Sequence, residues 1–467
     1  MSRTSLPITV DPGRFVSATA RTSRARVIAW ALWDWATQPF STVITTFVFS
    51  IYLTSSLFLE PADAALAAGT PEYDAAYGSL SSGLGLAVAV AGVVIAIVAP
   101  LLGRRSDAIG RRKGMLAANT AVIAVVTALM FFVEPDPRFF VFGAVLIALG
   151  TVFNDLSYVP YNALLVEVST KENRARVGAL GWGIGYLGGI VAMIIVYVGF
   201  IAGEPFWFGT SETGSTNIRA IAVVCAVWIV VFSVPLFLIV PEPATSRARA
   251  EPAGIVASYR HVFATVRRIF TQDRSAFWFL ISSAVYRDGL AAVFLFGGVI
   301  AAVTFGFSFT EVLIFGILGS VLAGVSTIAG GWIEQRIGSR AVISFSLLAI
   351  VAFLLGMFFG RDAGPIAFWI CGLGVGFFSG PAQSASRTLM LDFAPRGAEG
   401  EFSGLYATTG RAASFITPVL WSVSIALGGA QYWGGLAILS VVAVGFLLFL
   451  LVKQPVKAEL DDQVLAA

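Results

Sequence analysis

Apolar residues along this chain come in long blocks that short polar segments separate. The hydrocarbon core of a membrane is about 30 Å thick, and roughly 20 apolar helical residues cross it. Blocks of that size predict twelve membrane-spanning helices. They cover residues 27–58, 77–102, 115–133, 139–168, 177–202, 218–240, 275–303, 309–333, 341–360, 365–393, 402–427 and 432–452. Several are longer than the membrane requires, so we expect them to tilt or to extend beyond it.

The amino-acid composition excludes other classes of protein. Hydrophobic residues make up 57% of the 467 residues and charged residues 12%, and the mean hydropathy is +0.85. A soluble globular chain carries about a quarter charged residues, so a soluble enzyme is excluded. The only cysteines, Cys225 and Cys371, both fall within apolar blocks, and no disulfide framework is expected.

Lys and Arg residues are distributed unevenly between the two sides of the predicted topology. Of the 30, 24 lie on the side that holds both termini, and 3 lie opposite, at Arg138, Arg219 and Arg361. The positive-inside rule therefore predicts that both termini are cytoplasmic. Arg outnumbers Lys 26 to 4 and the chain has no Asn-x-Ser/Thr sequon. We therefore expect a multi-pass protein of a bacterial plasma membrane.

The longest polar connection divides the predicted helices into six and six. The expected parts are a cytoplasmic tail at 1–26, a bundle at 27–240, a cytoplasmic linker at 241–274, a bundle at 275–452 and a cytoplasmic tail at 453–467. Residues 258–270 of the linker form a basic run, for which two roles stay open: it lies on the anionic inner leaflet, or it is a linker surrounded by water. The only histidine, His261, also lies there. We therefore expect no histidine proton relay in the membrane, no metal site and no cofactor.

A short basic loop occurs once in each half of the chain. Residues 103–113 read GRRSDAIGRRK, and residues 331–340 read GWIEQRIGSR. The matched pairs, 228 residues apart, are Gly103 with Gly331, Gly110 with Gly338 and Arg112 with Arg340. A weaker echo pairs Asp34 with Asp288.

The repeated loop resembles the signature of the major facilitator superfamily between its second and third helices. That signature is glycine, three residues, aspartate, two residues, glycine and arginine. The residues here are Gly103, Asp107, Gly110 and Arg111, followed by Arg112. Ala108 replaces a usual cation, and Gln335 replaces the aspartate in the second copy. The resemblance implies two six-helix bundles that rock against each other. It also implies that this loop is a conformational gate, with Asp107 against the start of the 402–427 helix.

A narrower resemblance extends over nearly the whole chain. Its segments are Trp33–Ala36, Tyr161–Leu165 with Glu167, Gly181–Gly189, Tyr286 with Asp288 and Gly289, Gly380–Ser384 with Ser386 and Arg387, and Gly404–Tyr406. In combination they resemble the branch that contains the autophagy-related vacuolar amino-acid effluxers and their bacterial relatives. This resemblance implies a transporter. Gly185 stands where the antiporter signature has proline, so drug–proton exchange is not indicated.

Six ionisable residues lie well inside predicted helices. They are Asp34, Asp155, Arg287, Asp288, Arg387 and Arg411. Each costs at least roughly 2.5–3.5 kcal/mol in the membrane, so we expect them to face a wet cavity or one another. Three charges of each sign suit a zwitterionic solute, whose carboxylate would meet an arginine and whose ammonium would meet an aspartate. Structural bridges within the protein are the alternative.

Polar residues at helical spacing indicate which faces line such a cavity, because they must point away from lipid. The stripes join Asp34 to Gln38, Asp155 to Tyr158 and Asn162, and Gln383 to Arg387. Trp182 and Tyr186 are further candidates, with ordinary packing between helices as the alternative. Asp34 lies between two tryptophans and has no cation beside it in sequence, so we expect it to carry a coupling proton. A bond to a neighbouring helix is the alternative role.

Together these features predict a secondary active transporter of a small polar metabolite, with an amino acid favoured and proton coupling as an option. Another organic solute, such as a drug, a sugar or an organic anion, is the alternative, and a passive channel or sensor is a more remote one. We do not expect an enzyme, because no nucleophile–base or metal constellation is visible, and no Gly-Lys pair exists for a nucleotide loop. The expected partners are the bilayer, the solute and protons, for a monomer that binds no nucleic acid.

Overall fold

The computed structural model describes residues 23–65, 71–109, 111–170, 172–242, 255–305, 307, 309–394, 399–428 and 432–453. Every regular element within these residues is a helix. Nine of the described helices are long and apolar enough to cross a membrane. The all-α membrane fold predicted from the apolar blocks is therefore confirmed. Most of both predicted tails lies outside the described residues.

The first half of the chain supplies a group of long helices. They are α1 Arg24–Pro39, α2 Phe49–Leu53, α4 Pro71–Ile109, α5 Arg112–Leu129, α6 Phe140–Val168, α7 Arg174–Phe200 and α8 Thr216–Ile239. Helix α4 has 39 residues, which at 1.5 Å per residue is about 58 Å and well beyond the hydrocarbon core. The expected extension beyond the membrane is therefore present in this helix.

The second half supplies a matching group after a helix in the linker, α9 Ile255–Gln272. Its members are α10 Arg274–Val299, α11 Phe309–Ile337, α12 Ser339–Phe359, α13 Pro365–Phe393, α14 Glu399–Ala413, α15 Ile416–Gly428 and α16 Trp433–Phe449. Short elements fill the connections: η3 Ser56–Phe58, α3 Pro61–Ala64, η4 Met130–Phe132, η5 Pro137–Phe139, η6 Trp207–Gly209, η7 Thr213–Ser215 and η9 Arg361–Ala363. A π-helical turn, η8 Ile300–Thr304, follows α10.

The block at 27–58 is divided rather than one regular helix. Pro39 ends α1, because proline has no N–H to donate and its ring disturbs the preceding turn. The π-helix η2, Phe40–Phe47, follows, and Thr46 Oγ1 donates to the carbonyl of Ser41 five residues earlier. Such π-helical segments are frequent at functional sites.

The block at 402–427 is also divided, between α14 and α15. The Asp288 carboxylate of α10 accepts hydrogen bonds from the N–H and the hydroxyl of Thr417, at 2.7 and 2.6 Å. Thr417 lies in the first turn of α15, where backbone N–H groups have no partner within the helix. A buried carboxylate from another helix therefore caps the second half of this span.

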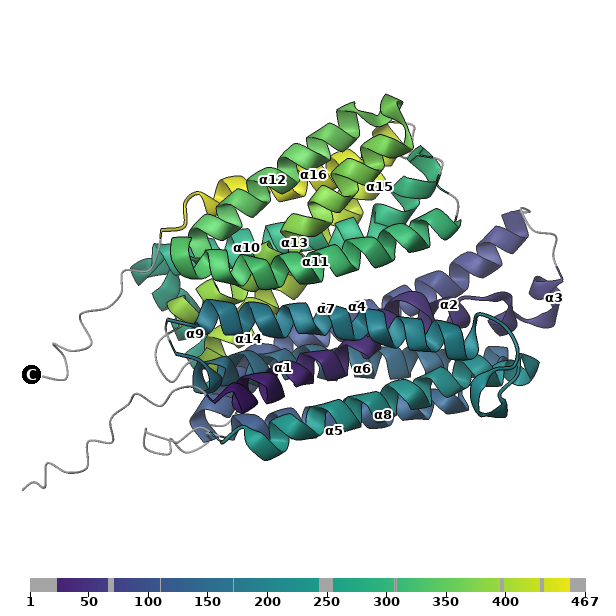
Figure 1. Cartoon of the computed structure of the whole chain (residues 1–467), viewed down its shortest axis with the longest axis horizontal. Helices are drawn as coiled ribbons and strands as arrows, with labels where there is room; N and C mark the ends of the chain where they lie inside the picture. Colours follow the sequence, from purple (N-terminus) through teal and green to yellow (C-terminus); the bar gives the residue numbers. More distant parts are fainter. Residues whose placement is uncertain are drawn as a thin grey trace, which may run out of the picture.

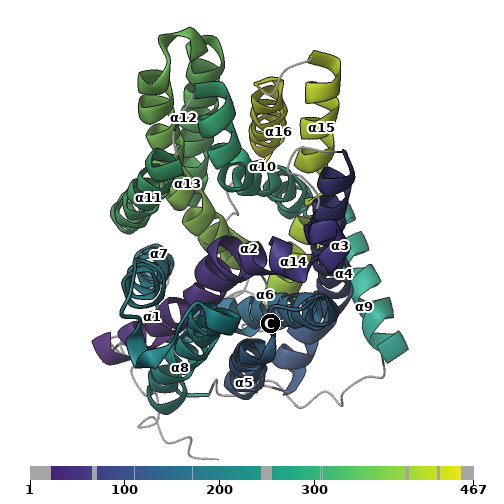
Figure 2. The ribbon, with the colours of Figure 1, turned by 90° about the vertical axis from the view of Figure 1, so that its right-hand side faces the viewer.

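The two groups of helices approach each other most closely at one end. Figure 2 shows them as two separate groups, and in Figure 1 they diverge toward the right-hand end. We call the close end, where α1 begins and α16 ends, the tail end. A Cβ on Gly103 of α4 would lie 2.0 Å from the Gly400 carbonyl oxygen of α14, and one on Gly331 of α11 would lie 3.2 Å from the Ala175 carbonyl oxygen of α7. The two repeated glycines thus both lie where helices of opposite bundles touch.

Candidate functional site

Asp34 of α1 is buried, and one of its oxygens has no hydrogen-bond partner among the described residues. The Tyr158 hydroxyl of α6 donates to Oδ1 at 2.9 Å. Oδ2 is buried without a hydrogen-bond partner among the described residues. A buried polar atom without a partner costs free energy, so this oxygen is a candidate position for a proton or a substrate donor.

Stacked aromatic rings hold the walls beside Asp34. Trp30 and Tyr161 stack with ring centroids 4.5 Å apart, and Trp33 lies 4.5 Å from the same tyrosine. Trp33 Nε1 donates to Thr120 Oγ1 at 2.9 Å, and Trp30 Nε1 donates to the Tyr161 carbonyl at 3.2 Å. Bonded, stacked rings of this kind have one packed orientation. The aromatic surroundings of Asp34 are therefore preorganised.

Arg387 of α13 brings a cation from the second bundle to this place. Its guanidinium lies 3.6 Å from the Trp182 ring centroid and 4.8 Å from that of Tyr158. It forms no hydrogen bond or ion pair with a described residue, and its charge acts electrostatically on Asp34 and Tyr186. Within the described part of the chain, the cation is thus contacted by aromatic faces, and its N–H groups donate to no described acceptor.

Two further candidates complete this group. Trp182 and Tyr186 of α7 pack edge to face at 5.8 Å. Gln383 lies one turn before Arg387 on α13, and both are half-buried while the residues between them are buried. We call Asp34, Tyr158, Trp182, Tyr186, Gln383 and Arg387 the Asp34 cluster. It is built from α1, α6 and α7 of one bundle and α13 of the other.

The remaining charged candidates are already paired. Asp155 of α6 forms an ion pair with Arg411 of α14, across the two bundles. Arg287 lies 4.0 Å from the ring centroid of Tyr406 and donates to the carbonyl of that residue. Asp288 caps α15. Within the described part of the chain, only Asp155 and Arg411 of these four residues form the kind of ion pair that the structural-bridge alternative describes. No described contact joins Arg287 or Asp288 to the Asp34 cluster.

Two polar candidates lie at contacts between helices. The Asn162 amide donates to Ser403 Oγ of α14 at 3.4 Å and is buried there. Gln38 lies beside Gly189, where a Cβ would stand 2.9 Å from its Cγ. Gln38 is half-buried, so of the two it keeps more freedom to meet a solute.

Arg112, at the start of α5, joins the two bundles at the tail end. Nη2 donates to Glu399 of α14 at 2.8 Å, Nη1 donates to the Ala163 carbonyl at 3.2 Å, and Glu167 lies 3.9 Å away. Gly110 and the side chain of Asp107 lie outside what the structure describes, so the expected contact of Asp107 with α14 stays a prediction. Arg111 is exposed. Helices α4 and α14 do meet, since a Cβ on Gly404 would lie 2.5 Å from the Ala99 carbonyl oxygen.

Sequence reasoning missed the acidic partners at this contact between the bundles. Glu399 opens α14, and Arg174 at the start of α7 pairs with Asp392 at the end of α13, at 3.3 Å. For Glu399 the available signal was an acidic helix start opposite a basic loop, because carboxylates are favoured at helix N-termini. Asp392 lies near the end of α13 and gives no such signal. We call the Arg112–Glu399 and Arg174–Asp392 pairs the tail gate.

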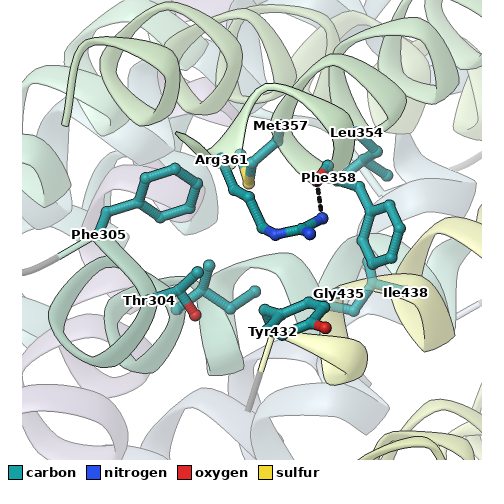
Figure 3. Close-up of a pocket in the computed structure, with 10 residues that line it drawn as sticks. Thr304, Phe305, Leu354, Met357, Phe358, Arg361, Tyr432, Gly435 and Ile438 are labelled. Carbon is teal, nitrogen blue, oxygen red and sulfur yellow. Dashed lines mark hydrogen bonds between the residues drawn. The ribbon is translucent and has the colours of Figure 1, made fainter. Parts of the chain in front are cut away.

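A separate pocket lies within the second bundle, at the end away from the tail end. Figure 3 shows Arg361 among Phe305, Met357, Phe358 and Tyr432. The space between the lining atoms is about 380 Å³, part of it open to the surroundings. No residue of the first bundle lines it. Rocking of the bundles would leave this pocket on one side of the membrane, which does not suit a transport site.

Among the described residues, no group of three His, Cys, Asp or Glu side chains could hold a metal.

The sequence is similar to a known family and to two of its relatives. A family model described as "Vacuole effluxer Atg22 like" matches residues 166–459. The chain is 23% identical to the MFS-type transporter YxiO of Bacillus subtilis over 440 residues, which cover 93% of this chain and 96% of that one. It is 22% identical to Autophagy-related protein 22 of Yarrowia lipolytica over 287 residues, covering 55% and 47%.

Solved structures show the same fold at low sequence identity. The proton:xylose symporter XylE superposes with a TM-score of 0.70 at 13% identity, covering 92% of this chain and 96% of that one. The fucose:proton symporter FucP of E. coli gives 0.68 at 15% identity, covering 92% and 98%. Both are two-bundle transporters of the major facilitator superfamily, whose fold this chain shares.

Proposed function

We propose a substrate for this chain, which belongs to the Atg22-like vacuole effluxer family of the major facilitator superfamily and is a secondary transporter of a small solute. The proposed solute is a small zwitterion, an amino acid above others, that is exchanged for protons or carried with them. The proposal covers the substrate, the coupling ion and the residues. The relatives named above support the transporter class. The substrate, the coupling ion and the residues are proposed from the contacts of the site.

The observation that carries the proposal is a pair of opposite charges with unused bonding capacity. Asp34 offers Oδ2 and Arg387 offers its guanidinium donors, and the two residues belong to opposite bundles. A carboxylate accepts an ammonium, and a guanidinium donates two parallel bonds to a carboxylate. One zwitterion could satisfy both groups, whereas Asp155 and Arg411 satisfy each other. A solute bound this way would link the two bundles.

Asp34 is also our candidate for the coupling proton. Burial disfavours the charged form of a carboxylate, and Asp34 is buried beside aromatic rings with one oxygen unbonded. Protonation would remove its attraction for Arg387 and for an ammonium group. Loading and unloading the proton would thus change both the substrate affinity and the attraction between the bundles, which is the requirement for coupled transport.

Two features support a topology for this proposal. The tail gate closes the end at which α1 begins and α16 ends, and the excess of Lys and Arg favours that end as cytoplasmic. With this orientation, in a bacterial plasma membrane, the Asp34 cluster would face outward. We also propose the domain limits 27–240 and 275–452 for the two rocking bundles, acting as a monomer.

The decisive experiment separates proton coupling from solute binding. Asp34→Asn in proteoliposomes is expected to abolish uptake driven by a pH gradient while preserving exchange of solute at equal pH. Asp288→Asn is the matched control, because an asparagine oxygen can still cap α15 through Thr417. Full gradient-driven uptake by Asp34→Asn would reject Asp34 as the coupling residue, and an equal loss in both variants would point to damage rather than coupling.

An organic anion is the second candidate solute, because Arg387 has no ion-pair partner among the described residues. A thermal-shift screen against amino acids, their deaminated acids, peptides and sugars distinguishes the two. A ligand at 100 times its dissociation constant adds about 2.7 kcal/mol of stability. Stabilisation by the acids alone would favour the anion, and stabilisation by the intact amino acids alone would favour the zwitterion. Accumulation against a gradient would exclude a passive channel.

A further inference from the structure

Helix α9 lies outside the bundles and follows a different direction from the spans. It packs on α4 of the first bundle and on α10 of the second. Figure 2 views the spans nearly end-on, yet α9 appears lengthwise at the rim beside α4. Its axis therefore runs across the spans at the tail end, which in a membrane is the plane of the surface.

One side of α9 faces the protein and the neighbouring side is apolar and exposed. Thr265 and Ile269 are buried. Successive residues are rotated by about 100°, so Val266, Phe270 and Phe263 follow each other on the next part of the circumference. Their exposed fractions are 41%, 58% and 72%. Two exposed phenylalanines and a valine on one edge are unfavourable in water.

Two arginines border this apolar edge, and a third lies across the helix from it. Arg260 and Arg267 lie next to Phe263 around the helix, whereas Arg268 lies nearly opposite the apolar edge. All three are exposed, and none forms an ion pair with a described residue. Around the helix, the side that contacts the protein is therefore followed by the apolar edge, and the apolar edge is followed by Arg260 and Arg267. The helix sequence contains no Asp or Glu to balance their charge.

We propose that α9 is a docking surface for anionic phospholipid headgroups of the leaflet at the tail end. In this arrangement Phe263, Val266 and Phe270 enter the boundary of the acyl chains, and Arg260 and Arg267 bind the lipid phosphates. Arg268, on the opposite side of the helix, adds positive charge near the anionic surface. An amphipathic helix with basic residues beside its apolar face lies in the membrane interface in this way. Cations near an anionic surface add to the attraction. A solvated linker helix would leave the apolar edge unexplained.

The position of α9 gives such lipids access to the transport cycle. Phe270 packs edge to face on Phe277 of α10 with centroids 5.0 Å apart, and α4 is the helix whose end touches α14 at Gly103. Lipid bound along α9 would thus hold both bundles beside the tail gate. This consequence does not depend on which solute is transported.

The test measures lipids retained by the intact protein. Wild type and Arg260→Gln/Arg267→Gln/Arg268→Gln are reconstituted in equal amounts of phosphatidylglycerol and phosphatidylcholine, re-extracted, and analysed by native mass spectrometry. We expect wild type to retain phosphatidylglycerol preferentially and the triple variant to lose that preference at least roughly tenfold. The matched control is Arg24→Gln/Arg26→Gln/Arg336→Gln, which removes equal charge from exposed positions outside α9. This control is expected to retain the lipid as wild type does.

Two further arms make the result decisive. Phe263→Ser/Phe270→Ser keeps every charge, and its expected loss of retention shows that the apolar edge takes part. Excess glycerol phosphate in solution is expected not to displace the lipid, because a free phosphate lacks acyl chains. Unchanged phosphatidylglycerol retention in the α9 arginine variant would overturn the proposal, as would an equal loss in the control triple. Monodisperse elution and unchanged thermal unfolding of each variant show that it is folded.

Discussion

Gly185 of α7 lies directly against the carboxylate of Asp34. A Cβ at Gly185 would stand 2.9 Å from Asp34 Cγ and 3.1 to 3.2 Å from its two oxygens. The carboxylate therefore occupies space that any side chain at this position would take. Where the antiporter signature has proline, this chain has the residue that leaves room for a buried acid.

Gly185→Ala should consequently impair proton-driven transport. The new methyl group displaces Asp34 from its hydrogen bond with Tyr158, since the surrounding rings leave little room. We expect uptake driven by a pH gradient to fall at least as far as in Tyr158→Phe. Gly178→Ala on the same helix is the control, because its Cβ would meet other atoms only at 3.4 Å or more. Equal activity of both alanine variants would show that Asp34 moves freely.

Arg387→Lys tests the arginine at the substrate site. A lysine keeps the charge but loses the planar fork that binds a carboxylate with two bonds. Loss of one charge-assisted hydrogen bond costs about 1.5–3 kcal/mol, so the dissociation constant of an amino acid should rise roughly tenfold or more. Binding is measured by calorimetry, with Arg361→Lys in the separate pocket as the control. Unaltered affinity with normal expression would remove Arg387 from the site.

Glu399→Gln should open the tail gate. Its bond to Arg112 is largely buried, with side-chain exposures of 10% and 7%, and breaking a buried pair typically costs about 3–5 kcal/mol. We expect faster thiol labelling at Ser403→Cys, a buried α14 position that contacts Asn162 across the bundles. Arg138→Gln breaks a pair in which the arginine is 84% exposed, and labelling should not change there. If both variants label alike, the buried pair does not hold the gate.

Gly103→Ala should separate the same helices sterically. Its Cβ would lie 2.0 Å from the Gly400 carbonyl oxygen, so the backbone of α4 or α14 must move. We expect a lower unfolding temperature in detergent and again faster labelling at Ser403→Cys. Gly92→Ala lies on the same helix with nothing within 4 Å, and it should be neutral or slightly stabilising. A neutral Gly103→Ala would mean that the two helices are already apart in solution.

The fold follows from the sequence because bilayer thickness acts on each helix separately. A run of apolar residues must be long enough to cross, whatever its neighbours are, so α6, α11 and α13 end close to the predicted limits. The repeated motif also marked two close contacts between helices, at Gly103 of α4 and Gly331 of α11, because close approach of two backbones requires a missing side chain at those positions.

Pairing of charges was decided only by the tertiary structure. Asp34, Asp155 and Asp288 look alike in sequence, yet one keeps a free oxygen, one pairs with Arg411 and one caps a helix at Thr417. Arg112 and Glu399 are 287 residues apart, and no local pattern specifies such a partner. A hydrogen bond needs atoms within about 3 Å in a defined direction, whereas burial of an apolar helix needs only the right length. Sequence therefore determined the spans and the charged residues, and the packing of the two bundles decided which charges were left for a solute.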